Sequence, residues 1–242
     1  LLTAGALLTL WRGTARERGI AAAALAVVWV AGFVARGEEF TQPKARTLEV
    51  ALAQGAIQQY LKWRPEQLPP TLALYDELTR QSAGADLVVW PEAAIPTLYE
   101  YVSEYLESLR QVAAERGSTV LLGILRLDPS DPESQTFQNI LVALTERPQV
   151  YVKRHLVPFG EYFPVPDFIR NWMRLMSLPY TDGVPGQANQ PPLAVVGESL
   201  AITICYEDVF GAEQLHYLPD ASLLVNVSND GWFGDSIAPH QH

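Results

Sequence analysis

Cysteine occurs once in the 242 residues, at Cys205, and its surroundings suit nucleophilic chemistry. An apolar run, Leu200 to Ile204, precedes it, and the β-branched residues in this run are typical of a buried strand. The cysteine therefore stands where the strand ends, and the acidic pair at 207–208 suits the first turn of a helix. Backbone N–H groups at such a turn favour the thiolate. Because an unpaired cysteine is also a common core residue, this stretch alone leaves nucleophile and core both open.

Two other reactive side chains follow predicted strands. Glu92 comes directly after the buried stretch L-V-V-W-P, and Lys153 ends the stretch V-Y-V-K. The ends of different strands can meet at one edge of an α/β sheet, where such proteins tend to place their sites. Taken singly, a Glu or a Lys just past a strand is usually a solvated residue. We expect these two side chains and Cys205 to converge.

The elements that must position these residues alternate between strand and helix from residue 48 onward. This alternation predicts the α/β class, with a sheet covered by helices. Strands are expected at 48–53, 86–90, 119–125, 137–144, 150–153, 193–196, 200–205 and 222–227, and helices at 68–83, 99–116 and 208–217.

Residues 154–192 interrupt the alternation with seven prolines and six Phe, Tyr or Trp residues. A connection of this length is usually functional or disordered, and the many aromatic residues argue against disorder. Within it, Phe168 and Trp172 share one face of a possible helix, with arginines on another. The segment 158–180 is therefore expected to be either an apolar arm over the site or a helix packed on its own domain.

Residues 1–36 predict membrane segments. Residues 1–11 are apolar and indicate the end of one helix, 12–19 are a basic loop, and 20–35 are an uncharged stretch between two arginines that can reach the headgroups. A buried core helix is the alternative. The arginine-rich loop predicts a cytoplasmic position, so residues 37 onward should lie outside. The polar residues 37–47 indicate a linker, and 48–242 a catalytic domain.

The charge is unevenly distributed along the chain. The whole sequence carries −10, and residues 1–36 carry +3 from four arginines and one glutamate, so residues 37–242 carry −13. An acidic domain of this kind is a poor partner for nucleic acid.

Four motifs make the chain similar to the nitrilase (carbon–nitrogen hydrolase) superfamily, and above all to its membrane-bound branch, the apolipoprotein N-acyltransferases. They are W-P-E at 90–92, K-R-H-L-V-P-F-G-E-Y at 153–162, C-Y-E at 205–207 and S-N-D-G-W-F-G-D-S at 228–236. The resemblance covers about residues 20–242. It implies a nitrilase-like α-β-β-α sandwich preceded by an N-terminal transmembrane helix, with no metal or organic cofactor. The family has further segments before and after these residues, so we expect the chain to be a fragment.

The resemblance also implies roles for individual residues. Glu92, Lys153 and Cys205 would form a catalytic triad of base, oxyanion donor and nucleophile. Glu161, Tyr206 and Glu207 would support it, with the Tyr206 backbone N–H as a second oxyanion donor. The residues expected to bind substrate are Trp63, Phe159, Tyr162, Phe168 and Trp172.

The reaction implied is acyl transfer in two steps. A phospholipid would acylate Cys205, and the acyl chain would then pass to the N-terminal amine of an S-diacylglyceryl-cysteine lipoprotein. The enzyme would sit in the bacterial inner membrane with its catalytic domain facing the periplasm. Two alternatives remain open: an amidase of the same superfamily, with water as acceptor, and a non-catalytic membrane-tethered module.

Overall fold

The computed structural model describes residues 1–39, 41–131, 136–166 and 183–241. The chain divides into two compact units, residues 1–47 and 48–242.

The first unit is a pair of helices, α1 (Leu2–Arg12) and α2 (Ala15–Ala35). A capping box starts α2: the Thr14 backbone N–H donates to the Glu17 carboxylate over 2.7 Å, and the Glu17 N–H donates to the Thr14 hydroxyl. The prediction of a loop over 12–19 is therefore wrong for most of its length, because the cap lets the helix begin at Ala15. By length and composition α2 could cross a membrane. Its membrane position stays a prediction.

The second unit contains two β-sheets among the described residues. The larger has the order β1-β2-β4-β5-β6, with β3 also paired to β4, and the smaller has the order β7-β8-β9. Strands β1, β2 and β4 run parallel, β5 and β6 continue antiparallel, and β8 and β9 are parallel. The strands are β1 (Val50–Leu52), β2 (Leu87–Val89), β3 (Ile95–Leu98), β4 (Thr119–Leu127), β5 (Phe137–Ala143), β6 (Gln149–Val152), β7 (Leu193–Val195), β8 (Glu198–Ile204) and β9 (Leu223–Val227).

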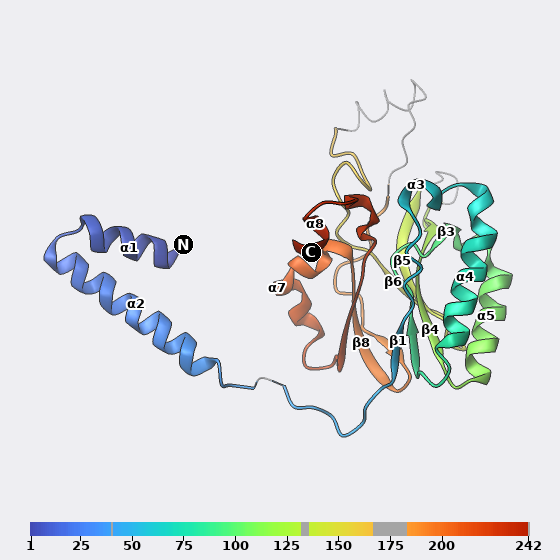
Figure 1. The fold of residues 1–242 in the computed structure, drawn as a ribbon, viewed down its shortest axis with the longest axis horizontal. Helices are drawn as coiled ribbons and strands as arrows, with labels where there is room; N and C mark the ends of the chain where they lie inside the picture. Colours follow the sequence, from blue (N-terminus) through green and yellow to red (C-terminus); the bar gives the residue numbers. More distant parts are fainter. Residues whose placement is uncertain (40, 132–135, 167–182, 242) are drawn as a thin grey trace. The chain divides into compact units, whose positions relative to one another are not determined.

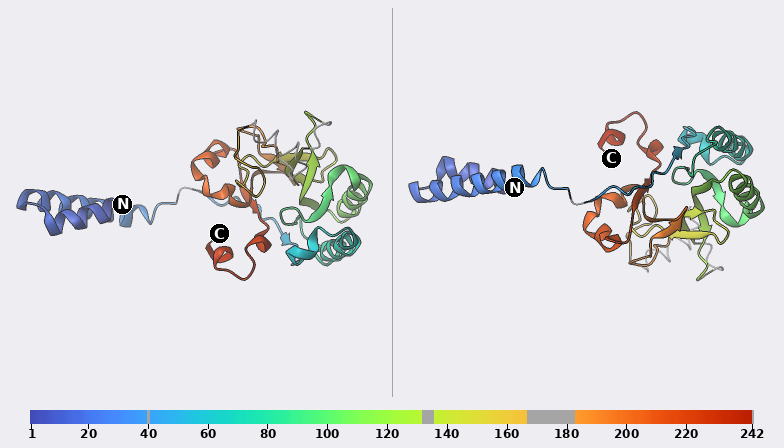
Figure 2. Two further views of the ribbon diagram at one scale, coloured as in Figure 1. Left: turned by 90° about the horizontal axis from the view of Figure 1, so that it is seen from above. Right: turned by 90° about the horizontal axis from the view of Figure 1, so that it is seen from below.

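Helices cover both outer faces, which gives four layers (Figures 1 and 2). Helices α4 (Leu68–Gln81) and α5 (Ser103–Glu115) lie on the larger sheet, and α7 (Gly211–Gln214) lies beside the smaller one. Successive side chains of β4 point to opposite faces of the sheet, so this strand contributes to two hydrophobic cores. Val120 and Leu122 pack toward the helices, whereas Leu121 packs between the sheets. The predicted fold class, a nitrilase-like α-β-β-α sandwich, is confirmed.

The other helices among the described residues are short. They are α3 (Gln59–Lys62), α8 (Ala238–Gln241) and the 3-10 turns η1 (Pro65–Gln67), η2 (Tyr99–Tyr101), η3 (Cys205–Val209), η4 (Leu215–Tyr217) and η5 (Asp230–Phe233). The predicted helix over 208–217 is present only as three short pieces, which belong to η3, α7 and η4 and are interrupted at Phe210. The Glu207 side chain turns back to accept from the Ile204 N–H over 2.7 Å, which favours a tight 3-10 turn, and Phe210 leaves the helical region with ψ 52°.

Candidate active site

Cys205 occupies a tight turn at the end of β8. Its φ is 58°, in the left-handed region that residues with a side chain rarely adopt. Asn226 of the neighbouring strand β9 steadies the turn, because its Nδ2 donates to the Cys205 carbonyl oxygen over 2.9 Å. A strained conformation held by its surroundings is common at reactive residues.

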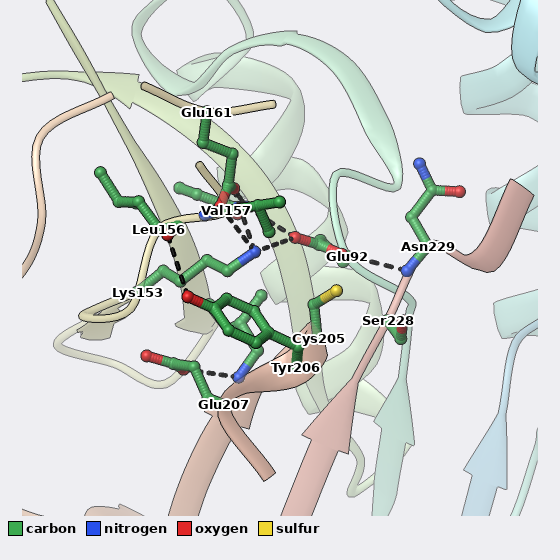
Figure 3. A network of polar contacts seen from close by, with 12 residues as sticks. Glu92, Lys153, Leu156, Val157, Glu161, Cys205, Tyr206, Glu207, Ser228 and Asn229 are labelled. Carbon is green, nitrogen blue, oxygen red and sulfur yellow. Dashed lines mark hydrogen bonds and ion pairs between the residues drawn. The ribbon is translucent and has the colours of Figure 1, made fainter. Parts of the chain in front are cut away.

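Glu92 follows β2, and both of its carboxylate oxygens are held. Oε1 accepts from the Lys153 ammonium over 2.9 Å and from Asn139 Nδ2 over 2.7 Å. Oε2 accepts from the backbone N–H of Asn229, after β9, over 3.0 Å. The carboxylate is thus fixed between the ends of the two sheets (Figure 3).

Lys153 follows β6 and is 1 % exposed. Its ammonium also forms an ion pair with Glu161 over 3.0 Å. Burial alone would lower the pKa of Lys153, but the carboxylates of Glu92 and Glu161 outweigh it and raise this pKa above its ordinary value. The site therefore holds a permanent positive charge beside the cysteine.

The cysteine itself is a neutral thiol at rest. Burial raises the pKa of Cys205, and the Glu92 carboxylate raises it further. Lys153, the Ser228 hydroxyl and the Tyr206 backbone N–H act in the opposite direction without overcoming the rise. The expectation of a favoured thiolate is thus not met, because burial and the Glu92 carboxylate outweigh the groups that favour the thiolate. Figure 3 shows the sulfur on the side of the Glu92 carboxylate, and the charges of both Glu92 and Lys153 act on the thiol.

The three residues predicted as a triad come from both sheets. Glu92 and Lys153 follow strands of the larger sheet, and Cys205 follows β8 of the smaller one. The structure brings them together at one end of the sandwich, with the charges of Glu92 and Lys153 acting on the thiol. A carboxylate, an ammonium and a neutral thiol in this arrangement can deprotonate the sulfur and stabilise an oxyanion.

The supporting residues lie behind this group. Glu207 is 1 % exposed and accepts from the backbone N–H groups of Ile204, Arg154 and His155 over 2.7–3.0 Å. It therefore ties the segment after Lys153 to the turn of Cys205. Tyr206 adds a second tie, because its hydroxyl donates to the Leu156 carbonyl over 3.0 Å.

Glu161, in the loop after β6, contacts the same ammonium and amide groups that hold Glu92. It accepts from Asn139 Nδ2 and the Lys153 ammonium, each over 3.0 Å, and from the Val157 N–H over 2.8 Å. These contacts fix the loop against Lys153.

The predicted substrate-binding residues are less closely grouped. Trp63 follows α3 and is 43 % exposed, and Tyr162 is half-buried. Phe159 is 69 % exposed and packs edge-on against Phe163. Phe168 and Trp172 lie outside the described residues. These assignments remain predictions.

Sequence reasoning missed Asn139, Asn229, Ser228 and Lys62. Asn139 had a visible signal, since it is a polar residue in an otherwise apolar strand. Asn229 and Ser228 lie in the fourth motif, to which no role was attached, and Lys62 precedes Trp63. Within the described ranges, no group of three or more His, Cys, Asp or Glu side chains is placed to hold a metal ion.

Comparison with known proteins places these features in a family. The family model described as carbon-nitrogen hydrolase matches residues 49–242. Among solved structures, a carbon-nitrogen hydrolase from Helicobacter pylori superposes with a TM-score of 0.51 at 17 % identity, covering 75 % of this chain and 59 % of that one. An amidase from Nesterenkonia sp. gives 0.50 at 20 % identity, covering 77 % and 66 %. At this identity the two structures establish the fold alone.

Curated bacterial proteins named apolipoprotein N-acyltransferase are much more similar in sequence. The Methylococcus capsulatus protein is 40 % identical over 240 residues, covering 99 % of this chain and 47 % of that protein. Those of Nitrosomonas europaea and Pseudomonas syringae are 41 % and 38 % identical, covering 90 % and 100 % of this chain and 44 % and 48 % of their own. The chain thus spans about half the length of these relatives.

Proposed function

The chain belongs to the carbon-nitrogen hydrolase family, and from this premise we propose that it is the catalytic part of a lipoprotein N-acyltransferase. The observation that carries the proposal is the neutral Cys205 thiol beside the Glu92 carboxylate and the Lys153 ammonium. Its 36–42 % identity to proteins named apolipoprotein N-acyltransferase favours acyl transfer over amide hydrolysis.

In the first step Glu92 takes the thiol proton as the sulfur attacks an ester carbonyl of a phospholipid. The negative charge that develops on the carbonyl oxygen is stabilised by the Lys153 ammonium and the Tyr206 backbone N–H. When the carbon–oxygen bond breaks, Glu92 returns the proton to the departing alkoxide. The products are a Cys205 thioester and a lysophospholipid.

In the second step the α-amine of a diacylglyceryl-cysteine lipoprotein attacks the thioester. Glu92 removes a proton from the amine, and the same two donors stabilise the second oxyanion. The sulfur departs and recovers a proton from Glu92, which leaves an amide on the lipoprotein and a free thiol. A thiolate leaves more readily than an alkoxide, so cysteine suits a role that demands both attack and departure.

We place the reaction at the bacterial inner membrane, with residues 48–242 on the periplasmic side. The uncharged 20–35 stretch of α2 supports the membrane position, and the three arginines within 12–19, against one arginine after the stretch, support the orientation. An apolar surface has to shield the acyl chain between the bilayer and the thiol, since exposing the acyl chain to water costs about 0.8 kcal/mol per CH₂. The exposed Phe159 makes the 158–180 segment our choice for that surface.

The proposal is tested by intact-protein mass spectrometry after the 242-residue chain is mixed with phospholipid bilayers. We expect an acyl-sized mass increment that hydroxylamine removes and that Cys205→Ala lacks. Transfer of that acyl group to a diacylglyceryl-cysteine peptide is the second expected result. Release of free fatty acid in place of peptide acylation would identify a hydrolase, and no increment with a folded chain would indicate a non-catalytic module.

A further inference from the structure

Asn139 is a buried amide in the otherwise apolar middle of β5, and it has no role in the proposed reaction. Its side chain belongs to a residue that is 5 % exposed. Its Nδ2 donates to Glu92 Oε1 over 2.7 Å and to Glu161 Oε1 over 3.0 Å, so both hydrogens of the amide are used. A side-chain amide can thus present two N–H donors to two carboxylates without adding a charge.

The orientation of this amide is costly. Turning the amide over would place Oδ1 against two carboxylates, so these acceptors fix Nδ2 on their side. Within the described ranges, the buried Oδ1 of Asn139 has no hydrogen-bond partner. An unsatisfied buried acceptor is unfavourable, and a leucine of similar size would avoid it. Packing therefore gives no reason for an asparagine at this position, whereas the contacts of Nδ2 do.

The two carboxylate oxygens of Glu92 differ in what they can still accept. Oε1 accepts from Asn139 Nδ2 over 2.7 Å and from the Lys153 ammonium over 2.9 Å, and these two donors occupy both of its lone pairs. Oε2 accepts over 3.0 Å from the Asn229 backbone N–H, which is the one donor to it among the described residues, so a lone pair stays open. A proton can therefore bind Glu92 at Oε2 without breaking a contact that holds the side chain.

Oε2 is also the oxygen on the side of the smaller sheet, which carries the cysteine. Its donor Asn229 follows β9, and β9 is paired with β8, the strand that precedes Cys205. The Ser228 hydroxyl, one residue before Asn229, forms a hydrogen bond with the Cys205 thiol. The donors to Oε1 come instead from β5 and from the end of β6 in the larger sheet. Figure 3 shows Lys153 and Asn229 approaching the carboxylate from opposite directions.

We infer that Asn139 is a positioning residue for the Cys205 reaction: it closes Oε1 of Glu92, so that Oε2 is the oxygen that exchanges protons with the thiol. In the first step the S–H bond breaks and an O–H bond forms at Oε2, while both donors stay on Oε1. When the leaving group departs, the same proton returns to it from Oε2. Asn139 thus selects which oxygen takes up the proton. The inference deepens the proposed function and rests on it for the identity of the acyl donor.

The test is acylation of Cys205 by a short, water-soluble p-nitrophenyl ester in the 242-residue chain. Release of p-nitrophenolate gives the maximum acylation rate and the ester concentration at which half that rate is reached. This leaving group needs no proton, so the rate reports the attack for which Glu92 is the base. For Asn139→Leu we expect a maximum rate about 10–100-fold below wild type, because the carboxylate can turn once Oε1 has lost a donor. The half-maximal concentration should stay unchanged, because Asn139 does not touch the ester.

Gln138→Leu is the matched control. Gln138 is the neighbouring amide of β5, is 8 % exposed and accepts from the Arg126 guanidinium over 2.9 Å. Its side chain lies on the opposite face of the strand from Asn139. The control therefore removes a buried amide from the same strand, and it should leave the maximum rate and the half-maximal concentration as in wild type.

Asn139→Asp separates the hydrogens of the amide from its shape, because the side chain is nearly isosteric but lacks the N–H donors. At about pH 8 we expect a loss at least as large as for Asn139→Leu, and Asn139→Ala carries the test if either variant does not fold. Wild-type acylation in these variants, or a change confined to the half-maximal concentration, would overturn the inference. A wild-type chain that reacts with the ester as expected but takes no acyl chain from phospholipid would refute only the proposed function.

Discussion

The buried carboxylates of the candidate site differ in the groups that hold them. Glu92 accepts from one ammonium, one amide and one backbone N–H, and its charge acts on the thiol. Glu207 accepts from three backbone N–H groups and from the Tyr151 hydroxyl, and its contacts lie behind the turn of Cys205. The first is placed to exchange protons, whereas the second is placed to fix the chain.

Glu207→Gln should therefore lower stability more than a typical surface change. The amide has one acceptor oxygen where the carboxylate has two, and its NH₂ group meets N–H donors that cannot accept from it. We expect a loss of about 1–3 kcal/mol in the free energy of unfolding, measured by urea titration. Glu115→Gln, at an exposed site on α5, is the control and should change stability little. Equal stability of the two variants would contradict the role assigned to Glu207.

The pH profile of Cys205 provides a second test at the residue scale. Since the pKa of the thiol lies above its ordinary value, its alkylation by iodoacetamide should reach half-maximum at a higher pH than that of a free cysteine peptide. Lys153 favours the thiolate, so Lys153→Met should move the half-maximum further upward. A downward shift would mean that the charge of Lys153 does not favour the thiolate of Cys205.

At the scale of the elements, strand β4 passes unusually close to the turn that carries Glu92. A Cβ on Gly123 would lie 2.6 Å from the Pro91 carbonyl oxygen and 2.7 Å from the Glu92 Cα. These contacts are with backbone, so a side chain at this position must displace the turn. The glycine therefore allows the carboxylate to sit directly against the sheet.

Gly123→Ala should consequently move Glu92 away from Lys153 and Cys205. We expect at least a tenfold slower acylation of Cys205, roughly the effect of a misplaced catalytic group, together with reduced thermal stability. Gly211→Ala is the matched control, because its Cβ would have no heavy atom within 4 Å. Unchanged acylation in Gly123→Ala would show that the turn adapts without moving the carboxylate.

All the described strands except β3 could be predicted, because apolar runs such as 200–204 are local signals. The four-layer sandwich followed from the family motifs. The hydrogen bonds around Glu92 could not be predicted, since Asn139 and Asn229 lie far from it in sequence and no local pattern announces their contact. The helix expected at 208–217 is divided into short pieces for a similar reason: Glu207 serves the Cys205 turn and does not start a regular helix.

At the scale of the whole molecule, residues 48–242 contain both hydrophobic cores, whereas residues 1–47 contribute an apolar helix. We expect a chain of residues 48–242 to fold and to alkylate at Cys205 at the rate of the full 242 residues. Its acylation by bilayer phospholipid should fall strongly, because nothing holds it at the membrane, while acylation by a short water-soluble ester should persist. Equal losses with both donors would show that residues 1–47 support the site itself.

The division of the site between two sheets has a mechanical consequence. The nucleophile belongs to the smaller sheet and its base to the larger one, so their separation depends on the thickness of the apolar layer that includes Leu121, Leu141 and Ile202. Close-packed protein interiors have low compressibility and transmit strain, so a load on this layer reaches both sheets. Compression that shifts one sheet against the other would therefore slow the reaction of the Cys205 thiol while the strands remain intact. The reaction rate would then report the spacing between the two sheets.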